Sequence, residues 1–165
     1  MGGNMRRILS SISLGLEQFS RTAAVGFLSL MLVLVLFQVL ARYIFQSVPV
    51  WTEEAARYCM IWGGLFGATV AFAGDLDPRL IQPPKTGPKA WIVSAAWVRA
   101  AAAIVFLMPV LYHSDRFLRR GWHRTSEGIE IPMAFITVAV PLAVIIIFIH
   151  LAARLFGSQP DQPKQ

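Results

Sequence analysis

The chain has 165 residues, of which 56% are hydrophobic, and a formal net charge of +6. This hydrophobic share exceeds the roughly 45–50% of a typical soluble domain, so the composition predicts an integral membrane protein. A membrane-spanning helix needs about 20 apolar residues, which leaves room for about four spans and for no sizeable soluble domain. The basic residues flank apolar runs and form no continuous polar face, which argues against nucleic-acid binding and favours contact with anionic lipid headgroups.

Residues 5–19 predict a short amphipathic helix that lies in the membrane interface. Their apolar residues recur with a helical period, at Ile8, Leu9, Ile12, Leu16 and Phe19. Polar residues occupy the other faces, as in helices that lie on a bilayer. A cleaved signal peptide is the alternative, but Glu17 and Arg21 interrupt its apolar region, and the long run that follows lacks a small-residue cleavage site.

Four apolar segments follow, and we expect each of them to cross the membrane. They lie at about 22–45, 53–73, 90–112 and 131–156. Residues 1–156 therefore form one all-α membrane domain, with four transmembrane helices behind the interfacial helix, and the polar tail 157–165 is expected to be disordered. Prolines keep the connection 75–88 extended, whereas Pro132 suits the first turn of the last helix and Pro141 predicts a kink within it.

The second segment opens with a cluster of charged residues. Pro49 cannot continue the preceding helix, and Thr52 is the expected N-cap. Glu53 and Glu54 then fall in the first turn, where the helix dipole favours negative charge. Arg57 lies within reach of both carboxylates, so the cluster is expected to be largely neutralised within the chain.

Small residues recur every fourth position further along this segment. They are Gly63, Gly64, Gly67, Ala68 and Ala71. Such a pattern lets two helix backbones approach closely in lipid. The partner helix belongs either to this chain or to another subunit, and both alternatives stay open.

Two further polar residues lie inside apolar segments. Gln38 in the first segment is expected to form a hydrogen bond between helices. Arg99 lies nine residues after Ala90, which is about 13 Å of helix. It either snorkels to the headgroups from a helix that begins outside the membrane, or forms a charge pair with another subunit.

The segment 113–130 carries four arginines around apolar side chains, and it could lie on the lipid headgroups. The arginines are Arg116, Arg119, Arg120 and Arg124.

No catalytic or cofactor chemistry is assembled in the sequence. His113 and His150 lie at the late ends of antiparallel helices, about 28 Å apart, so they cannot share a haem iron. The single cysteine, Cys59, excludes an intrachain disulfide. Small coupled transporters use an acidic residue within a span to carry protons or cations, and the first, third and fourth segments have none in their interiors. The paired, interrupted hydrophobic segments of a self-sufficient secondary transporter are also missing. We therefore expect no enzyme, no cofactor or metal site, and no stand-alone transporter.

A longer motif runs through the second segment and its approach, at Arg42, Tyr43, Pro49, Trp51, Glu53, Glu54, Arg57, Tyr58, Trp62, Gly67 and Ala68. Together with Ile131-Pro132 and Val140-Pro141, it resembles the small membrane subunit of tripartite ATP-independent periplasmic (TRAP) transporters. The resemblance implies a scaffold that supports a large membrane subunit in sodium-coupled uptake of organic acids, which a periplasmic binding protein delivers. Sodium is then expected on the large subunit, and no cofactor on this chain.

The resemblance also implies locations and contacts. It places the chain in the bacterial inner membrane with both termini in the cytoplasm, an orientation that the basic residues favour only modestly. The cluster that we expect to contact phospholipid or the large subunit comprises Arg42, Tyr43, Trp51, Glu53, Glu54 and Arg57; a purely structural clamp is the alternative. The four arginines of 113–130 are expected to contact the binding protein. The competing function is a membrane anchor for a respiratory or other enzyme complex, and the substrate is not encoded in this chain.

Overall fold

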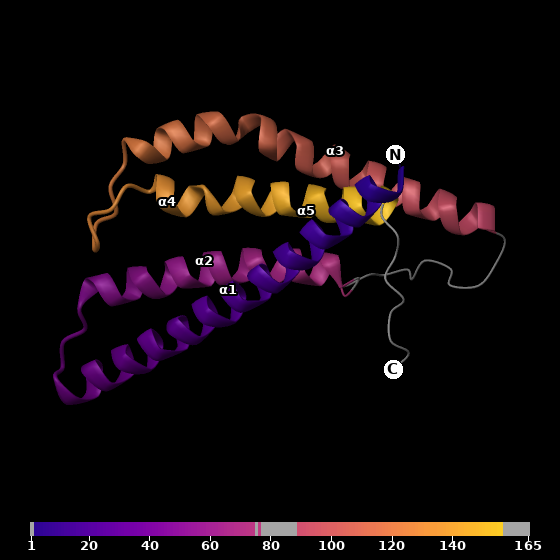
Figure 1. The fold of residues 1–165 in the computed structure, drawn as a ribbon. Helices are drawn as coiled ribbons and strands as arrows, with labels where there is room; N and C mark the ends of the chain where they lie inside the picture. Colours follow the sequence, from indigo (N-terminus) through magenta and orange to yellow (C-terminus); the bar gives the residue numbers. More distant parts are fainter. Residues whose placement is uncertain (1, 75, 77–88, 157–165) are drawn as a thin grey trace.

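Long helices account for most of the protein (Figure 1). The structure is a computed structural model that describes residues 2–74, 76 and 89–156. Its helices are α1 (Gly2–Ile44), α2 (Val50–Ala73), α3 (Lys89–Trp122), α4 (Ala134–Thr137) and α5 (Ala139–Phe156). One isolated bridge between Thr125 and Pro132 is the only β-pairing in this described part, which confirms the all-α prediction. The predicted tail 157–165 and the connection 75–88, apart from Leu76, lie outside the described residues.

Three of the described helices are long and apolar enough to cross a membrane, over Arg7–Ile44, Ser94–Trp122 and Ala134–Phe156. This supports a multi-pass membrane protein. The helix α2, predicted as a span at 53–73, is not among the three. Its crossing of the membrane therefore stays a prediction.

The helix α1 is continuous over 43 residues, which corresponds to about 64 Å. The predicted break between an interfacial helix at 5–19 and a span at 22–45 is absent. Glu17 forms an ion pair of 3.2 Å with Arg21 one turn further on, and Ser20 between them is completely buried. The residues between the two predicted elements thus continue the helix.

The N-terminal half of α1 packs on α5. Ser13 Oγ lies 2.7 Å from Nδ1 of the buried His150. Further along, Ala24 joins Phe66 of α2 and Ile146 of α5 in a buried cluster. The start of α1 is consequently part of the bundle and not a separate element.

The helices α1 and α2 pack more extensively than any other pair in the described structure. The ring of Phe27 stacks on Trp62 at 5.9 Å and on Phe66 at 6.3 Å between centroids. These aromatic contacts fill the seam where the two antiparallel helices cross (Figure 1).

The helix α3 packs on α4 and α5, and it contacts them near both of its ends. The rings of Trp97 and Phe156 are 6.3 Å apart at one end. At the other end, a Cβ added to Gly121 would lie 3.0 Å from the backbone nitrogen of Ala134. The helix continues to Trp122 instead of ending near residue 112, because the charged residues after Tyr112 remain helical. The helix thus extends beyond the predicted span of 90–112, whose membrane bounds stay a prediction.

The last predicted helix is interrupted at Val138, between α4 and α5. Pro141 has no N–H to bond the carbonyl of Thr137, which accounts for the interruption one turn before the proline. Val138 itself keeps helical backbone angles, and the predicted kink stays a prediction. The expectation for Pro132 was wrong. This residue pairs with Thr125 outside the helix, and Met133 is the N-cap of α4.

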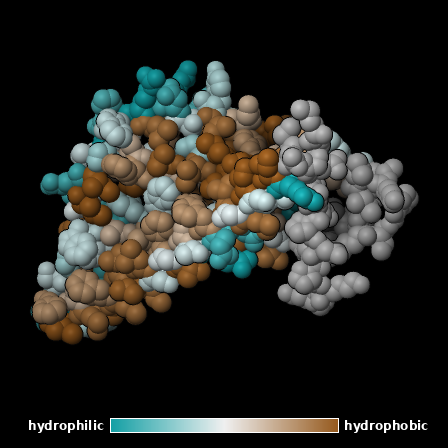
Figure 2. All heavy atoms as spheres, in the orientation of Figure 1, coloured by the Kyte–Doolittle hydropathy of each residue, from teal (hydrophilic) through white to brown (hydrophobic). Residues whose placement is uncertain are grey.

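Figure 2 shows that apolar side chains dominate the visible surface along the helices. Hydrophilic residues gather at the upper left, over the last part of α3. We call this side of the bundle the loop end; it holds the connections 45–49 and 123–133. Such a distribution fits a chain whose sides face lipid or other membrane helices.

Candidate functional site

The candidate site lies where α2 begins, at the loop end. Pro49 is the N-cap of α2, with extended backbone angles, and helical geometry starts at Val50. Thr52 is completely buried, and its hydroxyl donates a hydrogen bond of 2.7 Å to the carbonyl of Pro49. The prediction of Thr52 as N-cap was therefore wrong by three residues, because the proline already occupies that position.

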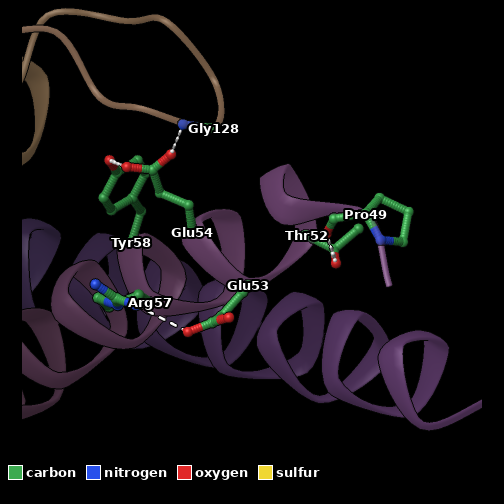
Figure 3. A network of polar contacts seen from close by, with 7 residues as sticks. All are labelled: Pro49, Thr52, Glu53, Glu54, Arg57, Tyr58 and Gly128. Carbon is green, nitrogen blue, oxygen red and sulfur yellow. Dashed lines mark hydrogen bonds and ion pairs between the residues drawn. The ribbon is translucent and has the colours of Figure 1, made fainter. Parts of the chain in front are cut away.

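Glu54 points away from α2 into the connection between α3 and α4 (Figure 3). Its Oε2 accepts hydrogen bonds from the backbone nitrogens of Gly128, at 2.7 Å, and of Ile129, at 3.1 Å. The hydroxyl of Tyr58 donates a further hydrogen bond to Oε1. We call this arrangement the Glu54 clasp, and it joins two parts of the chain that are distant in sequence.

The receiving connection is a tight turn that fits closely against α2. Its ends are tied by hydrogen bonds from Ser126 N to Ile131 O, at 2.9 Å, and from Met133 N to Arg124 O, at 2.8 Å. A Cβ on Gly128 would lie 2.6 Å from Glu54 Oε2 and 3.2 Å from Trp51 Cα. The position thus requires glycine, because any side chain would push the turn off the helix.

These contacts lower the pKa of the Glu54 carboxyl. The side-chain hydrogen bond from Ser126 is the largest cause, followed by that from Tyr58 and then by the two backbone N–H groups, while partial desolvation acts in the opposite direction. Glu54 lies at the mouth of α2, before the apolar part of the helix. The turn therefore binds the ionised carboxylate in preference to the protonated acid.

Glu53 has a different role from Glu54. Its Oε1 forms an ion pair of 3.0 Å with Arg57, and both side chains are exposed and point away from the connection that holds Gly128 (Figure 3). The structure therefore assigns Arg57 to one carboxylate, whereas the sequence placed it within reach of both. Of the two acids, Glu53 is available to a partner and Glu54 is committed to its own chain.

The other predicted contact residues at this end point outward. Tyr43 is 81% exposed and Trp51 is 49% exposed. Arg42 is exposed as well and forms no ion pair with another described residue. With Glu53 and Arg57 they make up the outer cluster, which is free to meet headgroups or a second protein.

The small residues of α2 divide between two faces. Gly63 is buried against α1, where an added Cβ would lie 2.9 Å from Leu28 Cγ. Gly64 and Gly67 have nothing within 4 Å of such a Cβ, and Ala68 is exposed. Ala71 is half-buried. Gly63 thus serves the contact with α1 of the same chain. Gly64 and Ala68 lie on the outward face, where a helix of another subunit stays a prediction.

Arg99 meets residues of its own chain. Its guanidinium carbon lies 5.6 Å from the ring centroid of Phe72, and that of Arg154 lies 5.7 Å from the same centroid. Arg154 also donates a hydrogen bond of 3.3 Å to the carbonyl of Phe72. Arg99 is two residues from Trp97, whose ring contacts that of Phe156 in the last turn of α5. Whether it also reaches the headgroups or another subunit stays a prediction.

The sequence analysis did not predict the contacts of two residues, Arg154 and His150. Arg154 is a basic residue in the last turn of α5. Cations are favoured there because they lie next to exposed backbone carbonyls, so its position in the sequence was a signal for a contact at a helix end. His150 was considered only as a haem ligand. Its pairing with Ser13 depends on the continuity of α1, which the sequence did not predict.

The described residues contain no group of three His, Cys, Asp or Glu side chains that could hold a metal ion. His113 Nδ1 lies 2.9 Å from the carbonyl oxygen of Pro109, whereas Nδ1 of His150 lies 2.7 Å from Ser13 Oγ.

The four arginines near the end of α3 differ in whether they form an ion pair. Arg119 Nε donates to Asp115 Oδ1 at 3.0 Å, forming an exposed ion pair. Arg116, Arg120 and Arg124 are exposed and have no carboxylate partner among the described residues. Their charge is therefore uncompensated at the loop end.

Comparison with known families agrees with these features. Residues 31–160 match the model for tripartite ATP-independent periplasmic transporters, DctQ component. The comparison with curated proteins finds no match. The matched range covers most of the chain, from the second half of α1 to beyond α5, and includes the Glu54 clasp, the outer cluster and the arginines of α3. The chain therefore belongs to the DctQ family, the small membrane components of TRAP transporters.

Proposed function

We propose that this chain is a scaffold subunit that braces the large membrane subunit of its transporter during uptake of organic acids. The large subunit then carries the substrate and sodium sites, and a periplasmic binding protein delivers the substrate. Family membership favours this function over the anchor of an enzyme complex, since DctQ proteins are transporter components.

The outward face of α2 supports the proposal most directly. Gly64 and Ala68 are exposed, one turn apart, while the opposite side of the same helix is packed on α1. An exposed small-residue face in lipid offers close approach to a further helix. We propose that α2 crosses the membrane as the fourth span and that this face receives a helix of the large subunit.

The Glu54 clasp gives such a scaffold its rigidity. It ties the start of α2 to the connection between α3 and α4, so the two helix pairs are fixed to each other at the loop end. We propose that this end is periplasmic, that both termini are cytoplasmic, and that the membrane is the bacterial inner membrane. The outer cluster then meets the large subunit or phospholipid, and Arg124 in the connection is a candidate contact for the binding protein.

Substitution of Gly64 by leucine tests the proposed interface. Since the site is open, Gly64→Leu should leave the isolated subunit folded but reduce co-purification with the large subunit and substrate uptake by more than tenfold. Gly26→Leu is the matched control, because Gly26 is also a helical glycine with nothing within 4 Å of an added Cβ. Unchanged uptake and complex yield for Gly64→Leu would refute this interface.

A further inference from the structure

The N-terminal half of α1 is held on α5 by one polar contact and one apolar cluster. Ser13 Oγ lies 2.7 Å from Nδ1 of His150, and Ala24, about three turns further along α1, shares a buried cluster with Ile146. The His150 side chain belongs to a residue that is only 4% exposed, although histidine changes its charge near neutral pH. The charge state of this one imidazole therefore bears on whether α1 stays docked.

One ring nitrogen of His150 has a partner and the other has none. Nδ1 meets Ser13, whereas Nε2 is buried without a hydrogen-bond partner among the described residues. A neutral imidazole has one N–H and one acceptor nitrogen, so the contact with the Ser13 hydroxyl suits either tautomer. A protonated imidazole donates from both nitrogens. Its charge and its second N–H would then be buried without an acceptor, which costs free energy.

The acid of this seam is already paired. Glu17 lies one turn after Ser13 on the same face of α1, and its Oε1 pairs with Arg21 at 3.2 Å. Ser20, about two turns after Ser13, is completely buried. Neither the Ser20 hydroxyl nor the Glu17 carboxylate forms a hydrogen bond with Nε2 of His150 in the described structure. A protonated imidazole thus finds no acceptor on α1.

The other helices near His150 supply no acceptor either. On α5, Arg154 lies one turn after His150, and its guanidinium carbon is 5.7 Å from the ring centroid of Phe72 in α2. The guanidinium carbon of Arg99 in α3 is 5.6 Å from the same centroid. Guanidinium groups only donate hydrogen bonds. The α2 residues 60–73 contain no titratable side chain. The described surroundings therefore accommodate the neutral imidazole.

We infer that His150 is an acid-sensitive latch, whose neutral imidazole holds the N-terminal half of α1 on α5 and whose protonation releases it. In the released state the imidazole reaches water or lipid headgroups and carries its charge at low cost. The docking of α1 then responds to the pH on the side of the membrane next to the end of α5. The inference rests on the contact between α1 and α5, so it is tested on the isolated chain, and its failure does not bear on the scaffold function.

The test is amide hydrogen exchange of the full chain in phosphatidylcholine nanodiscs. Exchange is measured at about pH 7.5 and about pH 5.5, on either side of the value near 6.5 at which histidine titrates in water. Protection is calculated relative to the intrinsic rate at each pH. A helix end that leaves the bundle frays and exchanges faster. Linkage predicts that protection around Ser13 falls about tenfold at the lower pH, while protection around Gln38 in the same helix changes less than about twofold.

A variant that cannot titrate should lose this response. His150→Asn keeps a polar group near the position of Nδ1, so its protection around Ser13 should differ less than about twofold between the two pH values. His123→Asn is the matched control, because it makes the same substitution at an exposed histidine of the 123–133 connection. It should keep the tenfold response. Equal protection of the wild-type chain at both pH values would overturn the inference, and so would a response that survives in His150→Asn.

A second variant keeps His150 in place and separates its titration from that of Glu17. Glu17→Gln removes the acid of the seam and should still lose protection about tenfold or more on acidification, with unchanged helical content by circular dichroism. Loss of the response in this variant would assign the titration to Glu17 and overturn the inference. Protection that rises on acidification of the wild-type chain would also overturn it, since Glu17 would then bind the charged imidazole and tighten the seam.

Discussion

The carboxylate of Glu54 holds the backbone amide of Gly128 at 2.7 Å, across 74 residues of sequence. This hydrogen bond and its neighbours at Ile129 and Tyr58 fix the turn between α3 and α4 on the start of α2. One side chain thus connects the two helix pairs at the loop end.

Neutralising Glu54 should weaken the bundle. Glu54→Gln keeps the shape of the side chain but replaces one carboxylate oxygen by an amide group that cannot accept these hydrogen bonds. We expect a lower thermal midpoint of the purified subunit in detergent and faster proteolysis of the 123–133 connection. Glu53→Gln is the control, since it removes only an exposed ion pair and should leave both measurements close to wild type. Equal midpoints for the two variants would refute the clasp.

The clasp also predicts how stability depends on pH. The folded-state pKa of Glu54 is lowered from its ordinary value of 4.5, so its contribution is complete above that value and is lost as the pH falls through the lowered one. The thermal midpoint of the wild-type chain should therefore decline more steeply below about pH 4.5 than that of Glu54→Gln. Parallel curves for the two proteins in this acidic range would contradict the prediction.

Gly128→Ala should be destabilising because its Cβ would approach Glu54 Oε2 to 2.6 Å. Overpacking of this kind costs about 1–3 kcal/mol. Gly64→Ala is the matched control, since the space around Gly64 is open and alanine is the better helix former by about 1 kcal/mol. Chemical denaturation in mixed micelles measures both values, and a neutral Gly128→Ala would show that the turn does not press on α2.

The contact between Ser13 and His150 should hold the N-terminal half of α1 on α5. Ser13→Ala removes a hydrogen bond to a buried imidazole, which costs about 1–3 kcal/mol when the partner is left unsatisfied. Ser11→Ala, on the exposed side of the same turn, should cost less than about 0.5 kcal/mol. Amide hydrogen exchange over the first turns of α1 reports the local effect; equal exchange in both variants would place the start of α1 off the bundle.

Much of the fold follows from local pattern, and the sequence was informative where that pattern is strong. The apolar runs predicted helices, and the structure has helices over each of them. The motif from Arg42 to Ala68 led to the family that the match confirms. These features depend on neighbouring residues or on a recurring motif, so they are visible without tertiary structure.

What the sequence did not predict depends on contacts between distant residues. Glu53 and Glu54 are chemically equivalent neighbours, and only the docked turn at Gly128 separates their roles. The docking of the N-terminal half of α1 involves Ser13 and His150, which are 137 residues apart in sequence. Arg99 and Arg154 are 55 residues apart in sequence, and only the packed helices bring both guanidinium groups to the ring of Phe72.

The central claim is that this chain supports a transporter without moving solute itself. Purified chain in liposomes, with a sodium gradient and a labelled organic acid that its transporter takes up, tests this claim most directly. We predict no flux above that of empty liposomes from this chain alone, and flux only when the large subunit and the binding protein are added. Accumulation of the labelled acid by liposomes that hold this chain and no other protein would contradict the claim.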